Sequence, residues 1–88
     1  MKVVVTRQFE RDVEKELNKA LQFTLADIVE HLKKVSSLKE IPNLKKMKGF
    51  KTAYRIRMGE YRIGFILQSD TITLSRIMNR KEIYRYFP

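Results

Sequence analysis

The sequence has no cysteine and no tryptophan, and only one histidine, two prolines and three glycines among 88 residues. Without cysteine, the chain can form neither a disulfide framework nor a thiolate metal site, which fits an intracellular, cytoplasmic protein. His31 has no second imidazole or thiol to work with, so zinc sites, Cys–His dyads and Ser–His–Asp triads are not expected. We expect His31 to be a solvated helix residue. The few glycines form no phosphate-binding loop.

Long apolar runs are also missing. No segment approaches the roughly 20 apolar residues that a membrane span requires, and residues 1–5 are shorter than the apolar region of a signal peptide. The ten carboxylates include no convincing pair for sugar hydrolysis or for a two-metal site. We therefore expect no membrane association, no metal and no cofactor.

Positive charge is abundant and unevenly distributed. Residues 1–42 contain eight Lys/Arg and seven Asp/Glu, a net of +1, whereas residues 43–88 contain eleven and three, a net of +8. A basic half beside a nearly neutral half favours a polyanionic partner, above all nucleic acid.

The first half predicts one strand and two helices. Residues 2–6 are a β-branched run, and Thr6 is a candidate N-cap. Apolar residues at helical spacing from Phe9 to Leu21 predict a first helix, and those from Leu25 to Val35 predict a second that begins at an N-cap on Thr24. A short link between them predicts an antiparallel helical hairpin.

The second half predicts a β-meander. Residues 38–51 read as a connector that carries four lysines, and strands follow at 52–58, 61–68 and 71–77. Gly59-Glu60 suits a type II′ hairpin turn, and Ser69-Asp70 suits another tight turn. The prediction is a single α+β domain over residues 1–88, in which the hairpin packs on one face of a sheet and a short basic C-terminal segment follows.

The Gly59-Glu60 turn fixes a register that gathers arginines on one face. Arg57 should pair with Arg62 and Arg55 with Gly64, on the face opposite the apolar pairs beneath the helices. Paired arginines repel each other, so this arrangement favours a phosphate ligand. Gly64 leaves space beside Arg55 in which a ligand can approach. Exposed arginines can also be simply solvated.

The C-terminal residues mix cations with aromatics, a pattern that can grip phosphates and stack on bases. We expect Ile83 and Phe87 to cap the core, and one of Tyr84 and Tyr86 to be functional. Arg76 follows core positions by alternation, and the sequence leaves open whether it is structural. If the protein is an enzyme, its arginines, lysines and tyrosines suit metal-independent RNA cleavage by a 2′-hydroxyl on the adjacent phosphate.

Two motifs, residues 54–63 (YRIRMGEYRI) and residues 80–84 (RKEIY), resemble the RelE/ParE toxin superfamily, and the order of elements matches as well. The resemblance implies a type II toxin with a RelE-like fold that cuts mRNA on the ribosome by 2′-hydroxyl attack, without metal, and is silenced by an antitoxin. By position it implies catalytic roles for Arg57, Arg62, Arg80 and Tyr84. We expect RNA contacts from Arg55, Lys45, Lys46, Lys48, Lys51, Lys81, Arg85 and Tyr86.

Some positions depart from the RelE pattern. Arg55 and Arg57 stand where well-studied relatives have lysines, and Asn79 stands where many have histidine, so the general base is open between the lysines of the connector, Tyr84 and Tyr86. Two alternatives remain. One is a ParE-like toxin directed at DNA gyrase, although such relatives usually lack the pattern of Arg80 and Tyr84. The other is a non-catalytic RNA- or DNA-binding module.

Overall fold

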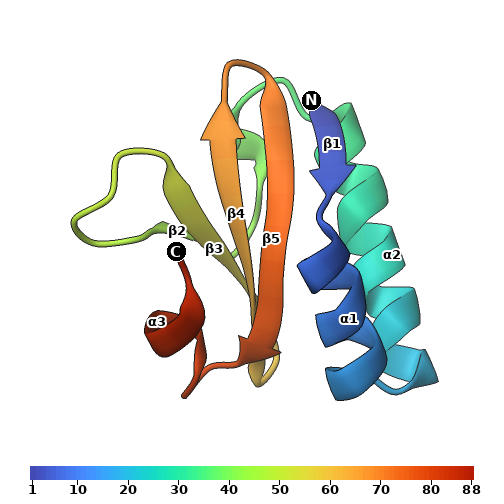
Figure 1. Cartoon of the computed structure of the whole chain (residues 1–88). Coiled ribbons are helices and arrows are strands. Elements are labelled where there is room, and N and C mark those ends of the chain that lie inside the picture. Colours follow the sequence, from blue (N-terminus) through green and yellow to red (C-terminus); the bar gives the residue numbers. More distant parts are fainter.

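The strands form a single five-stranded sheet in the order β1-β5-β4-β3-β2, in a computed structural model that describes residues 1–88 (Figure 1). The strands are β1 (Lys2–Val5), β2 (Leu44–Lys46), β3 (Ala53–Met58), β4 (Tyr61–Gln68) and β5 (Thr71–Asn79). β1 runs parallel to β5, and every other neighbouring pair is antiparallel.

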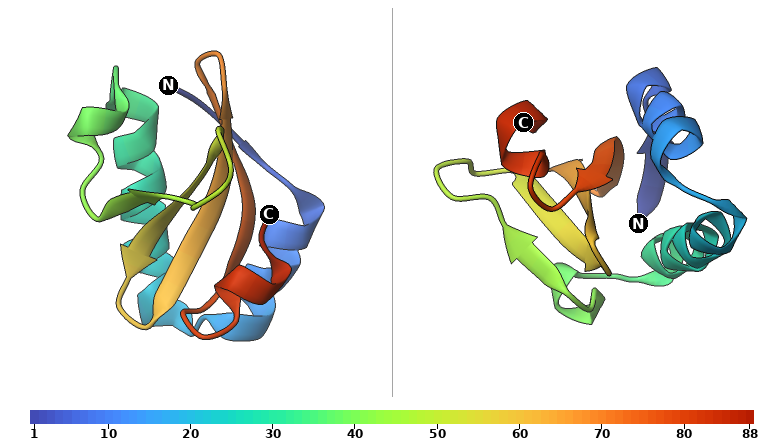
Figure 2. Two further views of the ribbon diagram at one scale, coloured as in Figure 1. Left: turned by 90° about the vertical axis from the view of Figure 1, so that its left-hand side faces the viewer. Right: turned by 90° about the horizontal axis from the view of Figure 1, so that it is seen from below.

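The helices lie on opposite faces of this sheet. They are α1 (Arg7–Glu16), α2 (Lys19–Lys34), the 3₁₀ turn η1 (Leu38–Glu40) and the short α3 (Ile83–Tyr86). α1 and α2 form a hairpin on one face, and α3 lies on the other (Figures 1 and 2). The predicted α+β fold with a helical hairpin on the sheet is confirmed. No helix has the length and apolar character that crossing a membrane requires.

The predicted boundary between the first two helices was wrong. α1 ends at Glu16, and α2 begins at Lys19 with Asn18 as its N-cap, whose side chain accepts a hydrogen bond from the backbone N–H of Leu21. Thr24 lies inside α2 and donates to the carbonyl of Ala20. The apolar spacing continues across the break, so periodicity alone did not reveal it. The predicted N-cap at Thr6 is confirmed, because its side chain accepts from the N–H of Phe9.

The connector and the tail contain more regular structure than the sequence indicated. Residues 38–51 include η1 and the edge strand β2, which pairs Lys45 with Arg55. β5 extends two residues beyond the predicted Ile77, and the basic C-terminal segment includes α3. β2 has only three residues, too few for a period-2 pattern to stand out.

The hairpin of β3 and β4 has the predicted register. Arg57 pairs with Arg62 and Arg55 with Gly64. Gly59 has a φ of +60°, and Glu60 does not have a positive φ. A type II′ turn requires this combination at its two central residues. The intervening Ile56, Ile63 and Phe65 are buried in the main core beneath the helices. The arginines therefore lie on the face away from α1 and α2.

A bulge in β5 explains the position of Arg76. Gly64 pairs with Arg76 but Phe65 pairs with Leu74, so Ser75 is an extra residue. Leu74 and Ile77 both reach the main core, and Arg76 lies between them. The alternation that placed Arg76 on the core face is thus interrupted.

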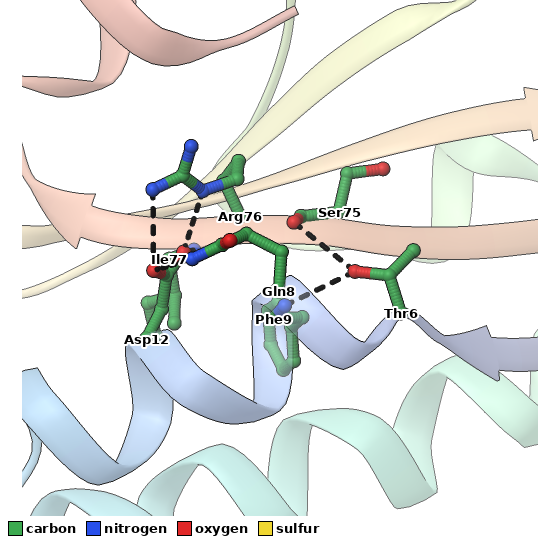
Figure 3. Close-up of polar contacts among 7 residues, drawn as sticks. All are labelled: Thr6, Gln8, Phe9, Asp12, Ser75, Arg76 and Ile77. Carbon is green, nitrogen blue, oxygen red and sulfur yellow. Dashed lines mark hydrogen bonds and ion pairs between the residues drawn. The ribbon is translucent and has the colours of Figure 1, made fainter.

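Asp12 of α1 anchors this irregular stretch of β5 (Figure 3). Its carboxylate accepts hydrogen bonds from Arg76 Nε at 2.8 Å and Nη2 at 3.2 Å, and from the backbone N–H of Ile77 at 3.1 Å. β1 pairs with β5 only as far as Leu74. Beyond that point, the carboxylate of Asp12 accepts the hydrogen bond from the backbone N–H of Ile77. Arg76 is therefore structural, one of the two alternatives the sequence left open.

A second small core covers the face away from α1 and α2. It consists of Met47, Ala53, Met78, Ile83 and Phe87. The burial of Ile83 and Phe87 confirms that they cap the core. The predicted open space beside Gly64 was wrong, because the ring of Phe87 fills it: a Cβ on Gly64 would lie 2.6 Å from Cδ2 of Phe87.

Candidate functional site

Three of the predicted catalytic residues line one open cleft of about 360 Å³ near the Gly59-Glu60 turn. Arg57 comes from the end of β3, Arg62 from the start of β4, and Arg80 follows β5. No apolar side chain lines this cleft. We call it the arginine cleft; its lining residues are Asn43, Arg57, Gly59, Glu60, Arg62 and Arg80.

Each of these arginines has at least one polar partner near the cleft. Arg62 Nη1 donates to the carbonyls of Gly59 at 2.8 Å and Tyr61 at 2.9 Å. Arg57 Nη2 donates to Asn43 Oδ1 at 3.4 Å, and Arg80 Nε lies 3.7 Å from Glu60 Oε2. A guanidinium has five N–H donors, so each arginine keeps donors for a ligand while its side chain is oriented.

The pKa of Arg62 is lowered from its ordinary value. Partial burial lowers the pKa of Arg62, and the charges of Arg55, Arg57 and Arg80 lower it further, against a smaller opposite effect from Glu60. Burial disfavours the charged guanidinium of Arg62 most, and the three neighbouring arginines add charge repulsion to that effect. An anion placed between them would relieve this repulsion.

A second cleft of about 290 Å³ adjoins the arginine cleft and shares Asn43, Arg57 and Arg62 with it. Its further residues include Lys45 and Arg55, which pair across β2 and β3. Tyr84 of α3 stacks its ring 5.3 Å from the guanidinium carbon of Arg55 and is 61% exposed. Tyr84 thus lies beside the basic residues while most of its surface stays exposed.

The remaining predicted RNA contacts lie outside both clefts. Lys46 pairs with Tyr54, whose ring packs on Phe65 in the main core, so Lys46 alternates away from Arg55. Lys48 and Lys51 are exposed in the connection from β2 to β3. In the C-terminal segment Lys81 is exposed, and Arg85 Nη1 lies 3.9 Å from Glu82 Oε2. The ring of Tyr86 lies near Arg76, and both residues line a separate cleft, away from the two clefts described above.

Sequence reasoning missed two residues of the site. Asn43 lines both clefts, orients Arg57, and adopts φ +61°, a conformation that asparagine tolerates better than most residues. Glu60 partners Arg80. The Pro42-Asn43 pair was the available signal for a turn at that point, but it gave no reason to place Asn43 next to an arginine 14 residues away.

The arrangement can bind and stabilise a phosphate that gains negative charge. Fixed arginines form charge-assisted, often bidentate hydrogen bonds with phosphate oxygens, and such donors suit a pentacoordinate phosphorane. No group of three or more His, Cys, Asp or Glu side chains is placed to hold a metal ion. His31 is exposed, and its Nε2 lies 2.9 Å from the carbonyl of Glu40, outside both clefts.

Comparison with known proteins shows the family. Residues 3–84 match the model of the family described as ParE toxin of the type II toxin–antitoxin system parDE. The chain therefore belongs to the RelE/ParE family of type II toxin–antitoxin toxins. Within it, the chain is 38% identical over 89 residues to Toxin RelE3 of Methanocaldococcus jannaschii, with full coverage of both proteins. The recognition of this family from the sequence is confirmed.

Solved structures show the same fold. The toxin–antitoxin complex RelB-RelE from Methanococcus jannaschii matches with a TM-score of 0.81 and 35% identity, covering 97% of this chain and 99% of that chain. The RelE-RelB complex from Pyrococcus horikoshii matches with a TM-score of 0.74 at 20% identity, covering 90% and 93% of the two chains, which is a likeness of fold. The RelE-like fold is thus confirmed.

Proposed function

We propose that this RelE-like toxin is an endoribonuclease that cuts mRNA on the ribosome and thereby inhibits translation. The observation that carries the proposal is the convergence of Arg57, Arg62 and Arg80 on one cleft, where burial and then repulsion from neighbouring arginines lower the pKa of Arg62. Fold stability gains nothing from crowding cations, whereas a scissile phosphate would be stabilised by them.

The proposed reaction is attack of the 2′-hydroxyl on the adjacent phosphate, with loss of the 5′-oxygen. Arg57 and Arg62 stabilise the charge on the phosphorane, and Arg80 acts on the leaving oxygen electrostatically or as proton donor. Tyr84 stacks on or orients a base, while Arg55 and Lys48 hold flanking phosphates. The chemistry needs no metal or cofactor.

The general base stays open among the lysines and tyrosines. Lys45 is the lysine that lines a cleft together with Arg57 and Arg62, and Tyr84 is the tyrosine next to Arg55. A lysine amine or a tyrosine phenolate could accept the proton of the attacking 2′-hydroxyl. The other proposed RNA contacts, at Lys46, Lys51, Lys81, Arg85 and Tyr86, would extend the basic surface around the clefts.

The proposed regulatory partner is a cognate antitoxin. The relatives from M. jannaschii and P. horikoshii were both solved as complexes with an antitoxin. An acidic or amphipathic segment that covers the basic face would complement its charge and block access to mRNA.

A gyrase-directed toxin is the second candidate, because the matching family model is described as a ParE toxin. One experiment separates the two. Purified toxin is added to a reconstituted translation reaction with and without ribosomes, and in parallel to a DNA gyrase supercoiling assay. We expect mRNA cuts that require ribosomes and unchanged supercoiling. Intact mRNA with inhibited supercoiling would overturn the proposal in favour of gyrase, and RNA binding without either effect would leave a binding module.

A further inference from the structure

Three residues stand in a row across the sheet, on the face away from α1 and α2. Arg55 of β3 pairs with Gly64 of β4, and Gly64 pairs with Arg76 of β5. The row therefore has a guanidinium at each end and a gap between them. We call Arg55, Gly64 and Arg76 the tail cradle, because the C-terminal residues lie on it.

Each member of the tail cradle receives one aromatic ring from the C-terminal segment. Tyr84 lies 5.3 Å from the guanidinium carbon of Arg55, and Tyr86 lies 5.9 Å from that of Arg76. Between them Phe87 is 4% exposed and occupies the place of a Cβ on Gly64, whose ideal position is 2.6–2.8 Å from three ring carbons. Real Cβ atoms do not approach so closely, so only glycine admits this ring.

Arg76 is the fixed end of the tail cradle. Two of its nitrogens donate to the carboxylate of Asp12, which is 4% exposed and also receives the side chain of Gln8 (Figure 3). The bidentate pair holds the guanidinium plane in place, and a planar cation is a good surface for an aromatic ring. Helix α1 thus orients, through Asp12 and Arg76, a segment on the opposite face of the sheet.

We propose that Gly64 and Arg76 are positioning residues, which dock the C-terminal segment so that Tyr84 stands beside Arg55 at the edge of the basic clefts. This inference deepens the proposed function and rests on it for the role of Tyr84, whereas the docking itself is a property of the protein alone. Neither residue needs to touch RNA. Their effect on cleavage passes through the placement of the tyrosine.

The test compares Gly64→Ala, Phe87→Ala and the double variant. Hydrogen exchange of residues 83–87 reports docking, and single-turnover cleavage on mRNA-programmed ribosomes reports catalysis. We expect Gly64→Ala to speed exchange about tenfold or more in this segment. We also expect it to lower the cleavage rate at saturating ribosomes about tenfold, with KM nearly unchanged, since Tyr84 is misplaced but the phosphate contacts remain.

The double variant makes the test specific. If Gly64→Ala acts by expelling Phe87, the double variant should match Phe87→Ala in both readouts; additive losses would overturn the mechanism. Phe23→Ala removes an aromatic ring that is 73% exposed on α2 and serves as the matched control. Should Gly64→Ala not fold, Tyr86→Leu removes the ring over Arg76 while leaving the strands untouched, and it should also speed hydrogen exchange of residues 83–87. Because Tyr86 is itself a proposed RNA contact, exchange is the deciding readout for this variant, and unchanged exchange would overturn the docking.

The two readouts separate the failure of this inference from the failure of the proposed function. Exchange that stays at the wild-type level in Gly64→Ala would overturn the docking, whatever the activity. Faster exchange with an unchanged cleavage rate would overturn the positioning role. If wild-type protein cuts no mRNA, the proposed function fails, and the positioning of a catalytic tyrosine fails with it, while the exchange data still decide whether the tail cradle holds the segment.

Discussion

Asp12 is the one charged side chain that the fold buries, and it links α1 to the irregular part of β5. A buried carboxylate is tolerated because four donors satisfy it, from Arg76, Gln8 and the backbone of Ile77. Removing one partner from such a pair costs far more than the pair contributes over an apolar replacement. The network therefore specifies where α1 sits more than it adds to stability.

Replacing Asp12 with asparagine should lower the free energy of unfolding by about 3 kcal/mol, since Arg76 then loses its counter-charge in a partly buried place. Urea denaturation measures this loss. Glu14→Gln is the matched control, because Glu14 lies on the same helix, is exposed and has no ion pair within 4 Å. Equal stability of the two variants would contradict the structural role assigned to Asp12.

At the scale of elements, the break between α1 and α2 decides which residues cap which helix. Asn18 satisfies an N–H at the start of α2, whereas Thr24 lies six residues into that helix. We therefore expect Asn18→Ala to destabilise the protein by about 1 kcal/mol. Thr24→Ala should change stability by less than about 0.5 kcal/mol, because alanine is the better helix former. Thermal and chemical unfolding of the two variants check the boundary, and the reverse order of effects would show that it is misplaced.

The elements that could be predicted are those whose signals are local. Gly59-Glu60 sets the turn, and the turn sets the register of β3 and β4, so the arginine face followed from the sequence. The bulge at Ser75 could not be predicted, because it depends on where β1 stops pairing with β5. The contact of Phe87 with Gly64 joins residues 23 positions apart, and its consequence was the reverse of the expected open space.

The candidate site was partly predictable for the same reason. Arg57 and Arg62 meet through the hairpin, and Arg80 returns to the same turn, where its backbone N–H donates to the carbonyl of Glu60 at 2.8 Å. Asn43 reaches the site through β2, which the sequence did not reveal. Lys46 was grouped with the other lysines because alternation cannot be applied to a connector whose strand has not been recognised.

At the scale of the whole molecule, nearly all of the +9 charge belongs to the sheet and the tail, while the helical hairpin is close to neutral. This asymmetry favours binding of a polyanion by one face, with affinity that depends strongly on salt. The antitoxin and the RNA are expected to compete for this face.

For a single-stranded RNA oligonucleotide, the logarithm of the association constant should fall linearly with the logarithm of the salt concentration. Arg57→Gln should reduce the magnitude of the slope by about 0.7, the value for one phosphate contact on a single strand. Lys39→Gln removes the same charge from η1, outside both clefts, and should leave the slope unchanged. Fluorescence anisotropy over a salt series provides the data. Equal slopes for all three proteins would place the RNA elsewhere.

The most direct test of the central claim is primer extension on a defined mRNA in a purified translation system, comparing wild type with Arg62→Ala, each with and without ribosomes. We predict that wild-type protein cuts the mRNA within A-site codons only when ribosomes are present. Arg62→Ala should make no such cuts, although it should unfold at nearly the wild-type temperature. Efficient cutting by a well-folded Arg62→Ala protein, or intact mRNA in every reaction with wild type, would contradict the account.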